Sequence, residues 1–175
     1  MADENSIKTY RSGVGKLLYL TKWTKPEISN IVRELSRFMT RVQWQHLEAM
    51  YRVMQYCIGT DELGLQIKPE KPLNNLHEIV GYPDSDYAKD TETRRSVSGY
   101  SVFLNGSPVQ WKSKMQECVS LSVTEAELIA ATSCAQEMIY IKKVLESINL
   151  KVKLPMVLRM DNKGAKDLIN NWTVG

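Results

Sequence analysis

The sequence contains few cysteines and histidines and no long apolar run, and each shortage argues against a class of protein. The three cysteines, Cys57, Cys118 and Cys134, lie far apart without a C-x-x-C pair, which argues against a disulfide framework and a zinc site. His46 and His77 are too few for a histidine-rich metal site. No apolar run approaches the roughly 20 residues that span a bilayer, and the polar start M-A-D-E-N-S is not a secretory signal. We therefore expect an intracellular protein with reduced thiols that does not contact a membrane.

The charge balance of the chain is nearly even. Lysine and arginine number 23 against 20 aspartates and glutamates, so the net charge is +3. This balance permits contact with a polyanion such as nucleic acid but does not require it. A length of 175 residues suffices for one domain, or for one domain and a fragment of another.

The first third of the chain carries helical periodicity. Apolar side chains recur every three or four residues between Ile28 and Met39 and again between Trp44 and Tyr56, and a shorter helix is expected over Val14–Leu20. We predict a helical segment over residues 1–60. It is followed by a connector over residues 61–77, where prolines interrupt regular structure and Leu65–Ile67 could form a short strand.

From residue 78 the pattern changes to alternating strands and helices. The expected elements are strands at Glu78–Asp84, Ser98–Leu104 and Pro108–Lys112, a helix from about Val123 to Ser147, a strand at Leu154–Met160 and a helix at Lys163–Asn170. The dipeptide Asn105-Gly106 is typical of a two-residue hairpin turn. A meander followed by a helical crossover predicts an α/β domain with a mixed sheet, in which three antiparallel strands are joined by a parallel one.

Three acidic residues stand where a carboxylate is costly. Asp84 and Asp161 end apolar strand segments, and Glu127 shares one face of its helix with Cys134 and Met138. Carboxylates near a core need compensation, and Mg²⁺ prefers oxygen ligands. If the three converge, their repulsion raises their pKa values, and a bound cation relieves it. This pattern indicates metal-assisted phosphoryl chemistry on a nucleic acid. The alternative is that each aspartate is a turn or cap residue, and that Glu127 lies at the rim of the core near the positive helix end.

Other polar residues near these carboxylates are weaker candidates. Those that could contact nucleic acid are Arg94, Arg95, Lys112, Lys114 and Asn162. The four cations could equally be solvated, and Asn162 could cap the following helix. Asp86 and Asp90 are expected to be solvated loop residues.

Blocks spread over nearly the whole chain resemble a known family. They are Y-R-S-G-V-G-K-L-L-Y-L (10–20), T-K-P-E-I (24–28), S-R-F-M (36–39), Y-R-V-M-Q-Y-C-I-G-T (51–60), G-Y-P-D-S-D-Y-A-K-D (81–90), R-R-S-V-S-G-Y (94–100), W-K-S-K-M-Q (111–116), L-S-V-T-E-A-E-L-I-A (121–130) and M-D-N-K-G-A (160–165). Together they are similar to the reverse-transcriptase tail and RNase H domain of copia-type LTR-retrotransposon Pol polyproteins.

The resemblance implies a role for each part of the chain. Residues 1–60 would be a thumb or connection segment of reverse transcriptase, and residues 78–175 an RNase H-like domain. Asp84, Glu127 and Asp161 would be the catalytic residues and would ligate Mg²⁺ or Mn²⁺, as two ions. The substrate would be the RNA strand of an RNA–DNA hybrid, and the partner would be the rest of the polyprotein, its fingers and palm. The expected location is the cytoplasm, in virus-like particles, or the nucleus.

Two departures from the family pattern lower the expected activity. The family's fourth acidic ligand lies further downstream, so we expect the RNase H-like domain to be C-terminally incomplete and this chain alone to be feeble or inactive. The polymerase signature Y-x-D-D is absent from the chain. The alternative function is a truncated or domesticated, non-catalytic RNase H-like domain that binds nucleic acid or a protein partner. A third possibility is an RNA-binding helical module joined to an unrelated α/β domain.

Overall fold

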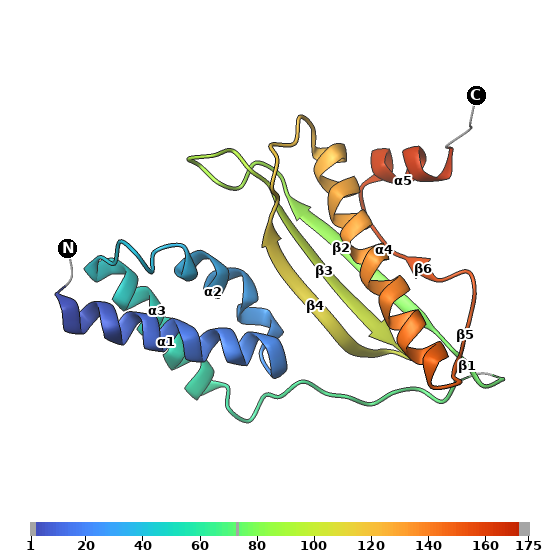
Figure 1. Ribbon diagram of the computed structural model, residues 1–175, viewed down its shortest axis with the longest axis horizontal. Coiled ribbons are helices and arrows are strands. Elements are labelled where there is room, and N and C mark those ends of the chain that lie inside the picture. The colour runs from blue at the N-terminus through green and yellow to red at the C-terminus, as the bar shows by residue number, and fades with distance from the viewer. Residues whose placement is uncertain (1–2, 73, 172–175) are drawn as a thin grey trace. The chain divides into compact units, whose positions relative to one another are not determined.

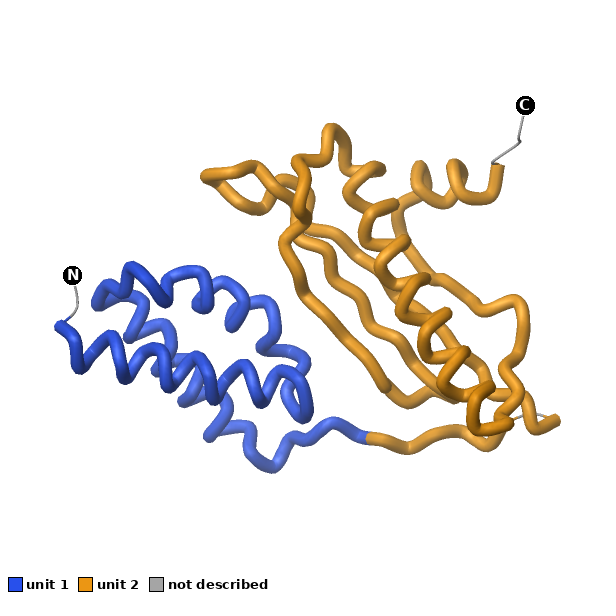
Figure 2. Tube along the Cα trace, viewed as in Figure 1, with its two compact units in different colours: residues 1–66 blue, residues 67–175 orange. Residues whose placement is uncertain are grey.

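The computed structural model describes residues 3–72 and 74–171, and the chain divides into two compact units, residues 1–66 and 67–175 (Figure 2). The division falls inside the segment 61–77 that was expected to be a connector. The predicted strand at Leu65–Ile67 is wrong, because these residues are irregular. Residues 1–2, 73 and 172–175, which belong to the predicted segments, lie outside the described part. None of the helices in the described part is long and apolar enough to cross a membrane.

The first unit is helical, as predicted. Its elements are α1 (Glu4–Trp23), the 3-10 helix η1 (Pro26–Ile28), α2 (Ser29–Ser36) and α3 (Trp44–Gly59). The helix α1 begins ten residues earlier than the predicted Val14, because the Asp3 side chain accepts a hydrogen bond from the Ser6 amide at 2.7 Å and caps it there. The helix α2 ends at Ser36 and does not reach the predicted Met39.

Two polar side chains connect the helices of this unit around an apolar core. The Tyr10 hydroxyl donates to the Leu35 carbonyl at 2.7 Å. The buried Lys25 ammonium donates to the carbonyls of Thr60 and Leu63, at 2.5 and 2.6 Å, just beyond the end of α3. The core between them consists of Tyr10, Val14, Leu17, Ile28, Val32, Leu35, Val42, Leu47, Met50 and Val53.

The second unit contains the mixed sheet that the sequence predicts. Its elements are β1 (Leu76–His77), β2 (Ile79–Asp86), β3 (Val97–Leu104), β4 (Ser107–Met115), α4 (Val123–Ser147), β5 (Lys151–Val152), β6 (Val157–Leu158) and α5 (Lys163–Asn170). The main sheet has the order β4-β3-β2-β6, and β1 pairs with β5 in a separate two-stranded sheet. In the main sheet β2, β3 and β4 are antiparallel, whereas β6 runs parallel to β2. The long helix α4 lies along one face of this sheet (Figure 1).

The turn and the last strand show one confirmed and one corrected prediction. Asn105 and Gly106 form the hairpin turn with φ of 47° and 79°, the left-handed values that a type I′ turn requires. The predicted strand Leu154–Met160 is reduced to Val157–Leu158. Pro155 has no N–H to donate to a neighbouring strand, so ladder pairing starts only after it.

The helix α4 approaches β2 closely because Gly81 has no side chain. A Cβ added at Gly81 would lie 2.5 Å from the Met138 sulfur and 2.6 Å from the Cys134 sulfur. Cys134 and Met138 belong to the apolar core between helix and sheet, with Ile79, Tyr100 and others. This close contact sets the depth at which α4 lies on the sheet.

We predict that Gly81→Ala lowers the free energy of unfolding of the second unit by about 1–3 kcal/mol, because the added methyl overpacks this contact. Urea unfolding measures the change. Gly99→Ala is the matched control in β3, because a Cβ there would meet only backbone oxygens at 3.9 Å. Equal stability of the two variants would contradict the described packing of α4 on β2.

Candidate metal centre

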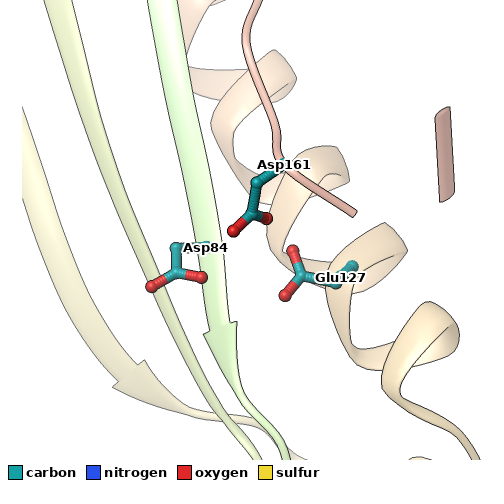
Figure 3. Close-up of side chains that lie close together, drawn as sticks. All are labelled: Asp84, Glu127 and Asp161. Atoms are coloured by element: carbon teal, nitrogen blue, oxygen red, sulfur yellow. The ribbon is translucent and has the colours of Figure 1, made fainter. Parts of the chain in front are cut away.

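The three predicted acidic residues come from three elements and meet at one place. Asp84 lies in β2, Glu127 in the second turn of α4, and Asp161 between β6 and α5. One carboxylate oxygen from each lies within 4.8 Å of the others (Figure 3). Asp84 and Asp161 are 77 positions apart in the sequence, and the fold brings all three residues within the reach of a single cation.

The parallel pairing of β2 and β6 places the two aspartates side by side. Gly81 pairs with Leu158, and the amide of Arg159 donates to the Gly81 carbonyl at 2.8 Å. Asp84 and Asp161 each follow their paired residue by three positions. Because parallel strands advance by about 3.3 Å per residue in the same direction, the two side chains reach the same end of the sheet.

Glu127 is carried to the aspartates by the start of α4. The Ser122 hydroxyl accepts a hydrogen bond from the Glu125 amide at 3.1 Å, while the Glu125 carboxylate accepts one from the Leu121 amide at 2.7 Å. These bonds fix where the helix begins. Glu127 then falls on the helix face that carries the buried Cys134, as the periodicity predicted.

The start of α5 holds Asp161 against α4. The Asn162 side-chain oxygen accepts a hydrogen bond from the Ala165 amide at 2.8 Å and caps α5. A Cβ on Gly164 would lie 3.0 Å from the Thr124 hydroxyl oxygen, so the first turns of α4 and α5 are packed closely. The cap role of Asn162 accounts for its side-chain oxygen, and its contact with nucleic acid stays a prediction.

Glu127 is a buried carboxylate with one oxygen left unpaired. It is 4% exposed, whereas Asp84 and Asp161 are exposed. The Ser85 hydroxyl donates to its Oε1 at 2.9 Å, but its buried Oε2 has no hydrogen-bond partner in residues 3–72 and 74–171. Burial raises the pKa of Glu127, and the charges of Asp84 and Asp161 raise it further, against the opposing effect of the Ser85 hydrogen bond.

This donor set fits a hard divalent cation. All three side chains offer oxygen, which Mg²⁺ and Mn²⁺ prefer. No lysine, arginine or histidine of the described part forms an ion pair with Asp84, Glu127 or Asp161. A cation bound between the carboxylates would supply the positive charge and the partner for Oε2 that the protein itself does not provide.

The weaker basic candidates lie on the same unit and are exposed. Arg94 and Arg95 stand in the loop between β2 and β3, and Lys112 and Lys114 on β4. Lys114 pairs with the exposed Glu117 at 2.8 Å. Nothing in this geometry brings the four cations into the carboxylate cluster itself, so their contact with nucleic acid stays a prediction.

Three residues of β2 and of the loop after it were missed or misjudged from the sequence. Asp90 is not a solvated loop residue: it is 4% exposed and accepts hydrogen bonds from the amides of Glu92 and Thr93 and from the Thr93 hydroxyl. Asp86 is not a loop residue either, because it is the last residue of β2, and it pairs with Lys89 at 3.8 Å. Ser85, the hydrogen-bond partner of Glu127, was not predicted. The signal that could have identified it is strand alternation, which puts Ser85 on the face of β2 opposite that of Asp84.

We predict that, with divalent cations removed by EDTA, the Glu127→Gln variant becomes more stable to unfolding than the wild type as pH rises. The pKa of Glu127 in the folded protein lies above its ordinary 4.5. The wild type therefore holds full stability below 4.5 and loses part of it as pH rises through the raised value. Thermal unfolding should give similar melting temperatures at about pH 4 and a higher one for Glu127→Gln at about pH 7. Glu146→Gln, on the exposed face of α4, is the control, and an identical profile for both variants would refute the buried charge.

The chain is similar in sequence to Pol polyproteins of plant transposons. It is 38% identical over 162 residues to the retrovirus-related Pol polyprotein from transposon TNT 1-94 of Nicotiana tabacum and 38% identical over 162 residues to that from transposon RE1 of Arabidopsis thaliana. These alignments cover 93% of this chain but only 12% and 11% of the two polyproteins. The secreted RxLR effector protein 161 of Plasmopara viticola is 39% identical over 132 residues, which are 75% of this chain and 90% of that protein.

Neither a protein-family model nor a solved structure matches the chain. The sequence alignments therefore carry the assignment. Because they cover 93% of the chain, they include most of both compact units. The chain spans about 12% of the length of the TNT 1-94 polyprotein. The chain belongs to one family with the effector protein, of which it covers 90%, and the same segment occurs in the retrovirus-related transposon Pol polyproteins.

Proposed function

We propose that the chain is a metal-dependent ribonuclease H-type endonuclease segment of a copia-type retrotransposon Pol polyprotein, which hydrolyses the RNA strand of RNA–DNA hybrids. The observation that carries this proposal is the meeting of three carboxylates within 4.8 Å, one of them buried with an unpaired oxygen. The mixed sheet covered by α4 is compatible with an RNase H-like fold. The similarity to transposon Pol polyproteins supports the same setting.

Asp84, Glu127 and Asp161 would hold Mg²⁺ or Mn²⁺, and an RNase H-type site takes two such ions. When bound, the ions supply Lewis-acid stabilisation of the negative charge that develops at the scissile phosphate. The protein contributes the orientation of the ligands. The Ser85 hydroxyl holds one oxygen of Glu127, which leaves Oε2 as the oxygen available to a cation. The burial of Glu127 keeps this side of the site dry and strengthens its electrostatics.

The proposed substrate matches the weak charge bias of the chain. An RNA–DNA hybrid is recognised largely by duplex shape and by the 2′-hydroxyl, so a strongly cationic surface is not required. Arg94, Arg95, Lys112 and Lys114 would contact phosphates of the same duplex. The helical residues 1–60 would act as a thumb or connection segment, and the fingers and palm of the polyprotein would be its partners. The setting would be virus-like particles in the cytoplasm, or the nucleus.

The second candidate is a non-catalytic domain that binds nucleic acid or a protein. The match to the effector protein of Plasmopara viticola favours it, because this chain covers 90% of that protein, whose name states a role other than that of a Pol polyprotein. The aligned segment therefore makes up most of the length of that protein. A carboxylate cluster that fails to bind a divalent cation would favour this candidate over the nuclease.

We predict that Mg²⁺ or Mn²⁺ raises the melting temperature of the wild type. A ligand at 100 times its dissociation constant stabilises the folded state by about 2.7 kcal/mol. For a unit of this size that corresponds to a rise of roughly 10 °C or more. Asp84→Asn and Glu127→Gln should each abolish most of the rise, because each removes a ligand charge. Differential scanning fluorimetry over a range of cation concentrations measures it.

The control for this titration is Asp167→Asn in α5, an aspartate that lies outside the cluster. It should keep the full rise. Cleavage of a labelled RNA–DNA hybrid is then measured with the same variants, and any cleavage above background must disappear in Asp84→Asn. A cation effect that is equal in the wild type and in Glu127→Gln would eliminate the metal centre and with it the nuclease.

A further inference from the structure

The loop between β2 and β3, residues 87–96, is an ordered structure that ends in exposed cations. It begins at Tyr87, three residues beyond Asp84, which is about 10 Å along an extended strand. In Figure 1 it extends beyond the end of the sheet at which α4 begins. Arg94 and Arg95 are exposed on it, and no described carboxylate lies within ion-pair distance of either. Two exposed guanidinium groups thus lie on the loop that follows β2, the strand that carries Asp84. Lys114 lowers the pKa of the exposed Glu117, and the charge of Arg95 also helps to lower it.

The buried carboxylate of Asp90 organises this loop from inside. Its Oδ1 accepts hydrogen bonds from the Thr93 amide at 2.6 Å, the Thr93 hydroxyl at 2.9 Å and the Glu92 amide at 3.1 Å. Its backbone joins the two sides of the loop, since the Arg94 amide donates to the Asp90 carbonyl at 2.9 Å and the Asp90 amide donates to the Arg95 carbonyl at 3.1 Å. Five hydrogen bonds thus converge on one residue that is 4% exposed.

The loop also holds unfavourable backbone conformations, which indicates that its shape is imposed. Arg94 has φ of 56° and Ala88 has φ of 47°, both in the left-handed region that residues with a Cβ rarely adopt. Such conformations persist only where surrounding contacts enforce them. Here the contacts are those of Asp90 at Arg94, and the hydrogen bond from the Ala88 amide to the buried Ser96 hydroxyl at 3.0 Å. The direction in which Arg94 leaves the backbone is therefore set by Asp90.

We propose that Asp90 is a positioning residue, which fixes the loop so that Arg94 and Arg95 bind phosphates of the nucleic acid held at the carboxylate cluster. This inference rests on the proposed function, because the cluster defines where the duplex lies. Each strand of a duplex carries one phosphate per 3.4 Å of axis. The loop begins about 10 Å beyond Asp84 along β2, which is about the axial length of three nucleotides of one strand. Guanidinium groups suit this role because they bind phosphate in a bidentate manner.

The test measures hybrid binding by fluorescence anisotropy over a range of salt concentrations, with every variant made in the Asp84→Asn background so that no cleavage occurs. We expect the double variant Arg94→Ala with Arg95→Ala to raise the dissociation constant about tenfold and to lower the salt slope by about two, since each lost phosphate contact removes about 0.9. The variant Lys143→Ala, an exposed cation on α4, should leave both values within twofold of the background.

Substitution of Asp90 separates positioning from charge. Asp90→Ala should weaken binding and reduce the salt slope as the arginine variants do, although both arginines remain. Asp90→Asn keeps a side-chain oxygen that accepts the same amide hydrogen bonds, so it should restore binding to within twofold or better. Thr93→Val removes one of the bonds without removing Asp90 and should give an intermediate loss. Melting temperatures of all variants show whether the unit is folded.

The outcomes distinguish this inference from the proposed function. If Asp90→Ala binds the hybrid as the background does while folded, or if Asp90→Asn is as weak as Asp90→Ala, the positioning role is wrong. If the loop variants behave as expected but divalent cations do not stabilise the wild type, the loop binds nucleic acid and the nuclease proposal fails alone. If cations stabilise the protein but the double arginine variant binds the hybrid as the background does, the nuclease proposal stands and the loop has no part in it.

Discussion

The mutual repulsion of three carboxylates is the constraint around which the second unit is organised. Asp84, Glu127 and Asp161 offer oxygens within 4.8 Å of one another, and the burial of Glu127 makes its charge costly. A flexible framework would relieve this repulsion by moving the side chains apart. The surrounding structure prevents that, because β2 pairs with β3 along its whole length, α4 packs onto Gly81, and α5 is capped directly beyond Asp161. The cluster therefore costs stability that only a proton or a cation returns.

The parts of the fold that could be predicted are those in which local pattern and tertiary structure agree. The bounds of α4 and α5 and the Asn105-Gly106 turn follow from capping, periodicity and backbone preference, which act between near neighbours in sequence. The convergence of Asp84 and Asp161 also follows from sequence order, because a helical crossover between parallel strands brings their ends together. The mixed sheet is thus confirmed, while the role of the cluster stays a prediction.

The features that could not be predicted depend on contacts between segments whose proximity no local pattern shows. Asp90 has the composition of a solvated loop around it. Its hydrogen bonds to the amides of Glu92 and Thr93 are local, but the local pattern does not show that the carboxylate is buried. Gly81 looks like a weak position in a strand, whereas the sulfur atoms of Cys134 and Met138 fill the space that its missing side chain leaves. The short length of β6 could not be predicted either. An apolar run indicates that a segment is buried or extended, but it does not indicate how many of its amides pair with a neighbouring strand.

The strand β2 connects these features, and its alternation explains why they can coexist. Gly81 and Ser85 face α4, where one admits the helix and the other holds Glu127, and the strand continues through Asp86 into the loop that Asp90 organises. A change in how closely α4 packs on Gly81 would move Glu127 relative to Asp84, because Glu127 lies on α4 whereas Asp84 lies on the same strand as Gly81. The cluster and the loop likewise share β2 as their base, so a duplex bound to both would be aligned by one rigid element. In such an arrangement rigidity is what lets a cluster of like charges and a patch of cations act on one polyanion at a fixed spacing.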